Sequence, residues 1–552
     1  MGDPLLLESY WPADTTTPLL DVTLGELLRA AAMAHPGRVA LVEGTPDPRT
    51  RRRWTYAQLL ADAEAVARAL LKRFTPGERV AVYAANCPEW LVLQHGMSIA
   101  GILLVPLNPA YKAEEVTVIL RSCEAAGIFY GPSFRDNDLR RIVDGLSLPC
   151  LRERICLSAL PDLIVGGDAA TPLPAVDPND ALQIQYTSGT TGVPKGALLH
   201  HRGVVNTSRY VALRAGFREG GVWLNAMPMF HIGGSAVTSI GCLSRRGTYV
   251  LAPGFDPAST LELVESERAE TMLVVPTMVL GLLDHPDQDV RDLSSLTTIC
   301  SGATAVPASL VTRTKAAWNC GFTILFGQTE INGVVCQTSL DDSVQDQSET
   351  LGRPLPHAEV KVADPVSGAV APLGEVGEIC VRGYQTMHGY FGLAEETAAT
   401  LDVHGWLHTG DLGSMDERGY VRIAGRLKDM IVRGGMNLFP REIEDVLASA
   451  PGVAEVAVIG VSDPRWGEVV GAVVIPSDPH QPPTPEALNA YCRQRLAAHK
   501  SPRHYYFTDV LPMTPTGKVQ RFRLSELVSL GELAPVPWTP ATVSLAKEQH
   551  VD

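Results

Sequence analysis

The chain has 552 residues with a formal net charge of −15, and 45% of the residues are hydrophobic. This length exceeds one folding unit, and the composition is that of a globular protein with large apolar cores. The acidic balance argues against a nucleic-acid partner, because a polyanion would be repelled. The ten cysteines form no C-x-x-C pair, which argues against a zinc site and favours a reducing, cytoplasmic compartment.

The N-terminus has no basic segment before its short apolar run at residues 5–7, so we expect no secretory signal. Since no apolar stretch is long enough for a transmembrane helix, we also expect no integral membrane segment.

Hydrophobic periodicity in the first part of the chain alternates between helix and strand. Helical periods are found at residues 23–34, 59–73, 88–101 and 113–123, and the apolar runs 80–83 and 103–106 are expected to be strands. Thr23 and Glu26 form a capping box at the start of the first helix. Strands that alternate with helices predict βαβ units and a parallel sheet.

A second alternating set follows residue 200. Its expected helices are 201–215, 233–243, 257–268 and 277–283, and its expected strands are 222–227, 248–252, 271–275, 298–300 and 323–326. From 352 to 422, short strands punctuated by Gly and Pro predict a β-barrel-like unit without crossover helices.

The last segment predicts a compact α+β unit, with helices at 442–448 and 485–496 and strands at 453–459, 469–475 and 505–510. We therefore predict an α/β fold with a large N-terminal domain, residues 1–425, and a small α+β C-terminal domain, residues 426–552. The large domain is expected to contain two doubly wound α/β subdomains and the β-barrel-like unit.

Residues 186–196 read Tyr-Thr-Ser-Gly-Thr-Thr-Gly-Val-Pro-Lys-Gly and follow a buried apolar run at 181–186. Glycines let the backbone approach a ligand closely, while backbone N–H groups and hydroxyls can bind phosphate oxygens. The stretch is not a Walker A loop, because Pro194 precedes Lys195 and Gly196 follows it. It predicts a triphosphate-binding loop, whose members are Thr187, Ser188, Gly189, Thr190, Thr191, Gly192 and Lys195.

Other polar side chains in glycine-containing turns permit two interpretations each. A single histidine such as His231 is more often structural than catalytic. Glu330 suits Mg²⁺ beside a triphosphate but also suits an ordinary helix start. Asp411 could accept hydrogen bonds from ribose hydroxyls or lie in a solvated turn. Lys518, taken alone, is one surface lysine among many.

The run from Thr187 to Gly196 resembles the phosphate loop of the adenylate-forming enzymes. This family includes the acyl- and aryl-CoA synthetases, the firefly-type luciferases and the adenylation domains of peptide synthetases. At least six motifs occur in the family's order, and the resemblance extends from about Thr23 to Lys518.

The resemblance implies roles for individual residues. Thr191 and Glu330 would hold Mg²⁺, His231 would control access of the thiol to the acyl site, and Lys518 would contact the carboxylate and the α-phosphate. Lys428 would be the pivot of a mobile C-terminal domain. The implied nucleotide-binding residues are Ser301, Gly302, Ala303, Phe326, Gly327, Gln328, Thr329, Asp411 and Arg426, and Gly434 and Gly435 would line the thiol tunnel. Phe326 departs from the family pattern, which usually has Tyr there.

The implied cofactors are ATP, Mg²⁺ and coenzyme A, and the implied reaction has two steps. A carboxylate attacks ATP to give acyl-AMP and pyrophosphate, and a thiol then displaces AMP. Apolar candidates for the acyl site, Met229, Ile232, Ala303 and Phe326, favour a fatty or related acid. Two alternatives stay open: a stand-alone enzyme that loads the phosphopantetheine of an acyl-carrier protein, and a non-catalytic nucleotide-binding member. We expect a monomer or a homodimer.

Overall fold

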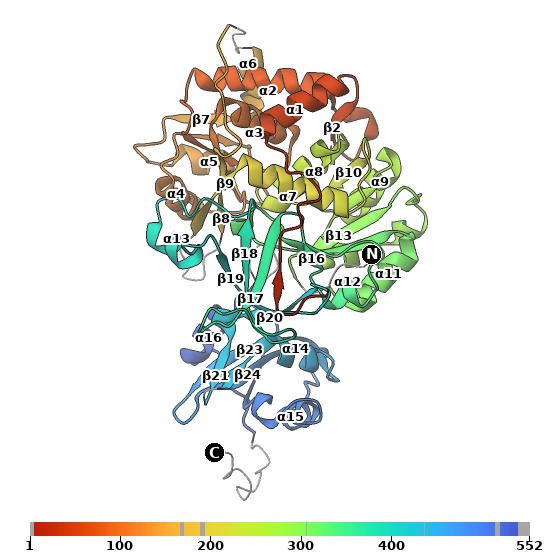
Figure 1. Cartoon of the computed structure of the whole chain (residues 1–552), viewed down its shortest axis with the longest axis vertical. Helices are drawn as coiled ribbons and strands as arrows, with labels where there is room; N and C mark the ends of the chain where they lie inside the picture. The colour runs from red at the N-terminus through yellow and green to blue at the C-terminus, as the bar shows by residue number, and fades with distance from the viewer. Residues whose placement is uncertain are drawn as a thin grey trace, which may run out of the picture. The chain divides into compact units, whose positions relative to one another are not determined.

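The computed structural model describes residues 5–165, 170–187, 194–304, 306–434, 436–513 and 519–538. The chain forms two compact units, a large unit 1 and a small unit 2 (Figure 1). Unit 2 contains Ile423–Asp552 together with the short segments Glu375–Ile379 and Gly410–Ser414, and unit 1 contains the rest. Because unit 2 includes segments from earlier in the chain, the predicted boundary between residues 425 and 426 stays a prediction. The predicted α/β fold is confirmed.

The first sheet of unit 1 has six strands in the order β7-β6-β4-β5-β8-β9. Their bounds are β4 (Arg79–Tyr83), β5 (Leu103–Leu107), β6 (Gly127–Tyr130), β7 (Glu153–Cys156), β8 (Ala181–Thr187) and β9 (Lys195–His200). The pairs from β7 to β8 are parallel, as the alternation of helices and strands predicts. The pair β8–β9 is antiparallel, and sequence analysis did not predict β9.

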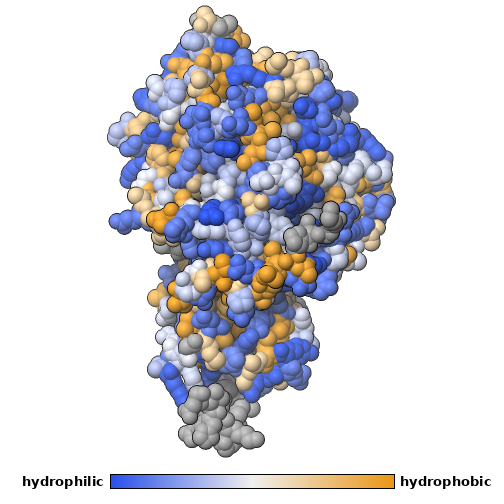
Figure 2. Space-filling model, viewed as in Figure 1, coloured by the Kyte–Doolittle hydropathy of each residue, from blue (hydrophilic) through white to orange (hydrophobic). Residues whose placement is uncertain are grey.

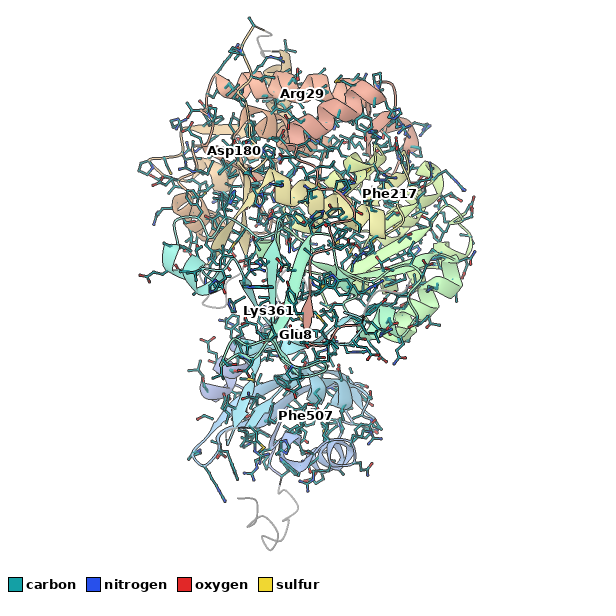
Figure 3. The ribbon with its side chains drawn as sticks, in the orientation of Figure 1. Glu8, Arg29, Asp180, Phe217, Lys361 and Phe507 are labelled. Carbon is teal, nitrogen blue, oxygen red and sulfur yellow. The ribbon has the colours of Figure 1, made fainter. Side chains whose placement is uncertain are left out.

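The helices α1 (Leu24–Ala34), α2 (Tyr56–Leu71) and α3 (Pro88–Ala100) pack against one another (Figure 1). The capping box predicted at Thr23 and Glu26 is confirmed at the start of α1. Arg29 on α1 (labelled in Figure 3) pairs with Glu64 on α2, with 3.0 Å between Nε and Oε1. Further helices near this sheet are α4 (Ala113–Ser122), α5 (Leu139–Asp144), α6 (Leu160–Val165) and α7 (His201–Arg214).

The second sheet of unit 1 has nine strands in the order β16-β15-β14-β13-β12-β10-β11-β2-β3. The five pairs from β14 to β2 are parallel, and those at both edges are antiparallel. The strands are β2 (Val39–Glu43), β3 (Arg53–Thr55), β10 (Val222–Asn225), β11 (Thr248–Leu251), β12 (Thr271–Leu273), β13 (Thr298–Gly302), β14 (Gly321–Phe326), β15 (Cys336–Gln337) and β16 (Arg353–Pro354).

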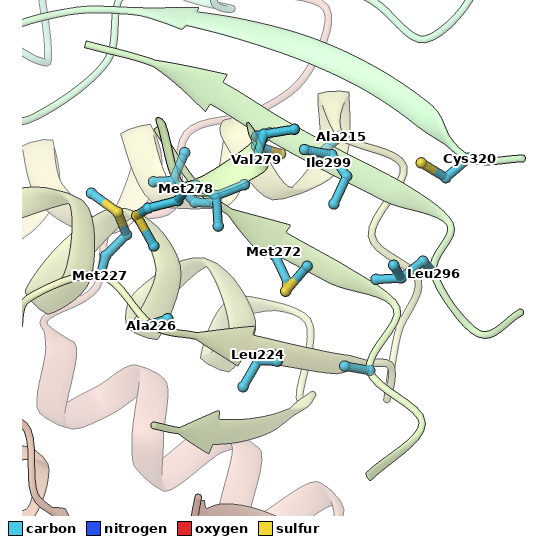
Figure 4. Close-up of a cluster of buried hydrophobic side chains, with 14 of the residues drawn as sticks. Ala215, Leu224, Ala226, Met227, Met272, Met278, Val279, Leu296, Ile299 and Cys320 are labelled. Atoms are coloured by element: carbon cyan, nitrogen blue, oxygen red, sulfur yellow. The ribbon is translucent and has the colours of Figure 1, made fainter. Parts of the chain in front are cut away.

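The helices of this part are α8 (Ser239–Ser244), α9 (Pro257–Glu267), α10 (Pro276–Leu283), α11 (Ala308–Trp318) and α12 (Asp346–Glu349). The helix expected over 233–243 is in fact a π-helix, Gly233–Thr238, followed by α8. An apolar core of unit 1 lies between this sheet and its helices and includes Met227, Met272 and Met278 (Figure 4).

A third, five-stranded sheet has the order β1-β17-β18-β19-β20, where the sequence predicts the β-barrel-like unit. Its strands are β1 (Tyr10–Trp11), β17 (Ala358–Ala363), β18 (Gly377–Gly383), β19 (Leu407–Met415) and β20 (Val421–Arg426), and α13 (Ala394–Thr400) precedes β19.

Unit 2 contains a sheet in the order β22-β21-β24-β23, with β25 also paired to β24. Its strands are β21 (Ile431–Arg433), β22 (Met436–Leu438), β23 (Val453–Asp463), β24 (Gly467–Pro476) and β25 (His504–Phe507). Its helices are α14 (Pro440–Ala448), α15 (Pro485–Arg493) and α16 (Arg521–Ser529). This mixture of strands and helices agrees with the predicted α+β character.

Polar residues cover most of the face of unit 1 that Figure 2 shows. Among the helices in the described ranges, none combines the length and the apolar character needed to cross a bilayer.

Three buried histidines of unit 1 predict that stability falls in mild acid. Burial lowers the pKa of His95, His200 and His201 to about 4, below the ordinary 6.5. At a pH between these two pKa values, the unfolded chain therefore binds more protons than the folded chain does. As a result, the free energy of unfolding decreases as the pH falls from about 6.5 towards 4. A shift of this size corresponds to about 3 kcal/mol for each fully buried histidine.

Urea unfolding followed at pH 7.5, 6 and 5 measures this effect. In the unsubstituted protein, the Leu24 N–H group donates to His201 Nδ1, and the variant His201→Gln keeps an acceptor for this group. The variant should lose less stability between pH 7.5 and 5 than the unsubstituted protein. The exposed His404→Gln is the control and should leave the pH dependence unchanged. An identical pH dependence in all three proteins would contradict the prediction.

Candidate active site

The predicted phosphate loop connects two antiparallel strands at the edge of the first sheet. Thr187, the last residue of β8, pairs with Lys195, the first residue of β9, and its hydroxyl donates to the Lys195 carbonyl at 3.4 Å. The loop residues Ser188, Gly189, Thr190, Thr191 and Gly192 lie outside the described residues. The strand pairing therefore fixes both flanks of the loop, Thr187 and Lys195, next to each other.

Glu330 and Lys195 both contact Tyr390. Glu330 lies in a short 3₁₀ helix, Thr329–Ile331, and its side chain is buried. The Tyr390 hydroxyl donates to Glu330 Oε1 at 2.9 Å, and Lys195 Nζ lies 5.2 Å from the centroid of the Tyr390 ring. One aromatic residue thus joins the candidate metal ligand to the candidate phosphate-binding lysine.

Sequence analysis missed Tyr390. The only local signal is a tyrosine after Gly389 in a turn, which does not distinguish it from an ordinary turn residue.

The His231 turn is bound to the phosphate-loop strand. Gln185 on β8 donates through Nε2 to the Phe230 carbonyl at 2.9 Å. The Gly233 N–H group donates to His231 Nδ1 at 3.1 Å, so in a neutral ring the proton is on Nε2. Gly234 must be glycine in this arrangement, because a Cβ atom would lie 2.3 Å from the Pro228 carbonyl oxygen. The π-helix that begins at Gly233 is a feature frequently found at functional sites.

The glycine turns at the ends of β13 and β14 lie next to each other. Ser301 pairs with Ile324 and Gly302 with Leu325, and a Cβ on Gly302 would lie 2.3 Å from the Leu325 carbonyl oxygen. Ala303 follows with a left-handed φ of +67°. These turns lie at the carboxyl ends of parallel strands, where α/β sheets bind ligands.

The segment after Phe326 passes close to the His231 turn. A Cβ on Gly327 would lie 2.0 Å from the Gly333 carbonyl oxygen, while a Cβ on Gly333 would lie 3.0 Å from Val237 and 3.8 Å from Ile232. Gln328 Nε2 donates to the Thr409 carbonyl at 3.5 Å. Unit 1 therefore brings together Lys195, the His231 turn, the β13 turn and the Phe326–Glu330 segment.

The surroundings of the His231 turn are apolar. Besides His231 itself, the atoms nearest to a Cβ built on Gly233 belong to Leu273 and Met227, each 3.7 Å away. Met229 and Ile232 are also buried.

The remaining predicted residues lie in unit 2. Asp411 is buried and pairs with Arg426, with 2.9 Å between Nε of Arg426 and Oδ1 of Asp411. Burial lowers the pKa of Lys428, an effect that the neighbouring Asp429 opposes. Gly434 has a φ of +57°, and a Cβ there would lie 2.8 Å from the Trp466 ring. Gly435 and Lys518 lie outside the described residues.

The described flanks of Lys518 are joined to the residue after Lys428. Met513 and Val519 form an isolated antiparallel bridge. Arg521, at the start of α16, pairs with Asp429 at 3.3 Å and with Glu444 at 2.8 Å. This connection lies wholly within unit 2.

Comparisons with known proteins agree with this arrangement. The family model described as AMP-binding enzyme matches residues 28–391, and that described as AMP-binding enzyme C-terminal domain matches residues 442–518. The putative acyl-CoA synthetase YngI of Bacillus subtilis (strain 168) is 35% identical over 539 residues, covering 92% of this chain and 97% of that protein.

Two further comparisons come from Rhodococcus and Rhodopseudomonas. The 3-[(3aS,4S,7aS)-7a-methyl-1,5-dioxo-octahydro-1H-inden-4-yl]propanoyl:CoA ligase of Rhodococcus jostii (strain RHA1) is 38% identical, covering 93% of this chain and 98% of that protein. The crystal structure of ATP-bound MatB from Rhodopseudomonas palustris is 30% identical, with a TM-score of 0.81, and covers 92% of this chain and 99% of that chain.

Proposed function

Because the chain belongs to the AMP-binding enzyme family, as an AMP-forming acid–CoA ligase that uses ATP and CoA, we propose that its acid is an apolar fatty or related carboxylic acid. The observation that carries this proposal is the apolar surroundings of the His231 turn, where Met227 and Leu273 lie nearest to Gly233. An apolar wall favours an apolar acyl group and gives a second carboxylate no partner. The Rhodococcus relative is named for an acyl group whose bicyclic carbon skeleton carries one methyl and two oxo groups, and this bulky, mostly carbon-based acid supports the same class.

We assign roles in the first half-reaction to individual residues. Lys195 and the loop after Thr187 bind the phosphates of ATP, while Asp411 and Arg426 contact the nucleotide. Lys518 neutralises the repulsion between the attacking carboxylate and the α-phosphate. The carboxylate oxygen forms a bond to the α-phosphorus as pyrophosphate leaves, which gives acyl-AMP.

In the second half-reaction the thiolate sulfur attacks the acyl carbonyl carbon and AMP leaves. His231 borders the path of the thiol with its Nε2–H group, and Gly434 and Gly435 line that path. Lys428 is the pivot about which the C-terminal part turns between the two half-reactions.

The surroundings of Glu330 suit a ligand of a magnesium ion. Its carboxylate is buried, and among the described residues no Lys or Arg forms an ion pair with it. A buried carboxylate needs a positive partner, and Mg²⁺ prefers oxygen ligands. Glu330 and Thr191 would hold the ion, which when bound neutralises charge on the triphosphate.

Acid-dependent release of pyrophosphate from ATP, measured with and without CoA, tests the proposal. The panel runs from short through long aliphatic acids to aryl and dicarboxylic acids. We expect turnover with apolar monocarboxylic acids that depends on CoA, and little with dicarboxylic acids. Preference for a dicarboxylic acid would contradict the proposed acid class.

The same assay distinguishes CoA from the alternative acceptor, a carrier protein. If acyl-AMP accumulates with an apolar acid and CoA makes no difference, the acceptor is the phosphopantetheine of a carrier protein.

A further inference from the structure

We propose that Tyr390 is a positioning residue for adenylation, which holds the Glu330 carboxylate and the Lys195 ammonium group in place for ATP and its divalent cation. This inference rests on the proposed roles of Glu330 and Lys195. It adds a residue that touches neither the acid nor CoA and acts through two side chains that it contacts.

The Tyr390 side chain offers each partner a different group. Its hydroxyl donates to Glu330 Oε1 at 2.9 Å. One such bond restricts the rotation of a flexible glutamate and leaves Oε2 to face a cation. The ring face lies 5.2 Å from Lys195 Nζ, within the range of a cation–π contact, and this orients the ammonium group without neutralising it.

The contact joins a hydroxyl donor to a carboxylate acceptor. It is therefore a charge-assisted O–H···O bond, which is stronger than a bond between neutral groups.

The backbone around Tyr390 is fixed to both neighbouring elements. On the phosphate-loop side, Phe391 N donates to the Gly196 carbonyl at 2.8 Å and Leu198 N donates to the Gly389 carbonyl at 2.9 Å. On the other side, Met387 N donates to the Glu330 carbonyl at 2.9 Å. The segment thus connects β9 with the 3₁₀ helix that carries Glu330, so Tyr390 has a defined position between its two partners.

The variants Tyr390→Phe and Tyr390→Leu separate the hydroxyl from the ring. Loss of the hydroxyl should weaken binding of the divalent cation to the enzyme–ATP complex by about tenfold, because one charge-assisted hydrogen bond is removed. Tyr390→Leu should also raise the KM for ATP by a further few-fold, because the ring face under Lys195 is lost. Thioester formation from supplied acyl-AMP should be unchanged in both variants.

The first readout is the Kd of Mn²⁺ for the enzyme–ATP complex, measured by electron paramagnetic resonance without turnover. The matched control is Tyr10→Phe, because the Tyr10 hydroxyl also donates to a glutamate, Glu359, at 2.6 Å but Tyr10 lies in β1, outside the site. This control should leave the Mn²⁺ affinity unchanged. A Tyr390→Phe variant with the Mn²⁺ affinity of the unsubstituted protein would overturn the proposal.

A double-mutant cycle with Glu330→Gln decides whether Tyr390 acts through Glu330. If it does, Tyr390→Phe should have little further effect on Mn²⁺ affinity in the Glu330→Gln background. Equal effects in both backgrounds would overturn the positioning role. Failure of the proposed function is a separate result, since it would appear as no acid-dependent pyrophosphate release from the unsubstituted protein.

Discussion

The Lys518→Ala variant is expected to lose acyl-AMP formation by about 100-fold or more, yet to form the thioester from supplied acyl-AMP at nearly the normal rate. Only the first half-reaction brings a carboxylate to a polyphosphate, so only this step needs the additional positive charge. The second step releases AMP from a mixed anhydride, and we expect it to proceed without Lys518. Single-turnover measurement of each half-reaction, with acid and ATP or with acyl-AMP and CoA, gives the two rates.

Lys500→Ala is a matched control for this variant. Lys500 also lies in unit 2, and its ammonium group pairs with Glu442 at 2.6 Å. Its replacement should leave both half-reactions within a few-fold of normal. Equal loss of the two half-reactions in Lys518→Ala would contradict the assignment of Lys518 to adenylation alone.

The Gly327→Ala variant should lower pyrophosphate release by about 100-fold and also destabilise the protein. The new Cβ would lie 2.0 Å from the Gly333 carbonyl oxygen and 2.6 Å from Val334 Cα, which are backbone atoms. The two segments must therefore separate, and Glu330 lies on the segment that moves. Overpacking of this kind costs about 1–3 kcal/mol of unfolding free energy, and a displacement of about 1 Å in a site can cost 100-fold in rate.

Activity per folded molecule, together with urea unfolding, distinguishes the two effects of Gly327→Ala. The control is Gly37→Ala, because a Cβ at Gly37 would have no neighbouring atom within 4 Å. That control should keep normal activity and stability. If the folded fraction of Gly327→Ala has normal pyrophosphate release, then the close approach to Gly333 does not position Glu330.

The arrangement of helices and strands could be predicted from local patterns where these patterns agree with the tertiary structure. Thr23 and Glu26 form the predicted cap, and alternating apolar runs give the parallel pairs of both large sheets. The membership of the family could be predicted because its motifs are short and continuous in the sequence.

Features that depend on contacts distant in the sequence could not be predicted. The strand Lys195–His200 was missed because its partner lies across a loop that carries glycines and a proline. The π-helix at Gly233–Thr238 has the same apolar periodicity as an α-helix over so few residues. Tyr390 is 60 residues from Glu330 and 195 residues from Lys195, so no local pattern connects the three side chains.

The ion pairs of Arg521 have a thermodynamic consequence for domain motion. With the pivot at Lys428, both partners, Asp429 and Glu444, follow the pivot in the chain, as Arg521 itself does. These contacts are therefore the same in every orientation, and an interaction of equal free energy in two states does not change their populations. Under the proposed pivot, Arg521 would therefore hold the described flank of Lys518 to unit 2 without favouring one orientation over another.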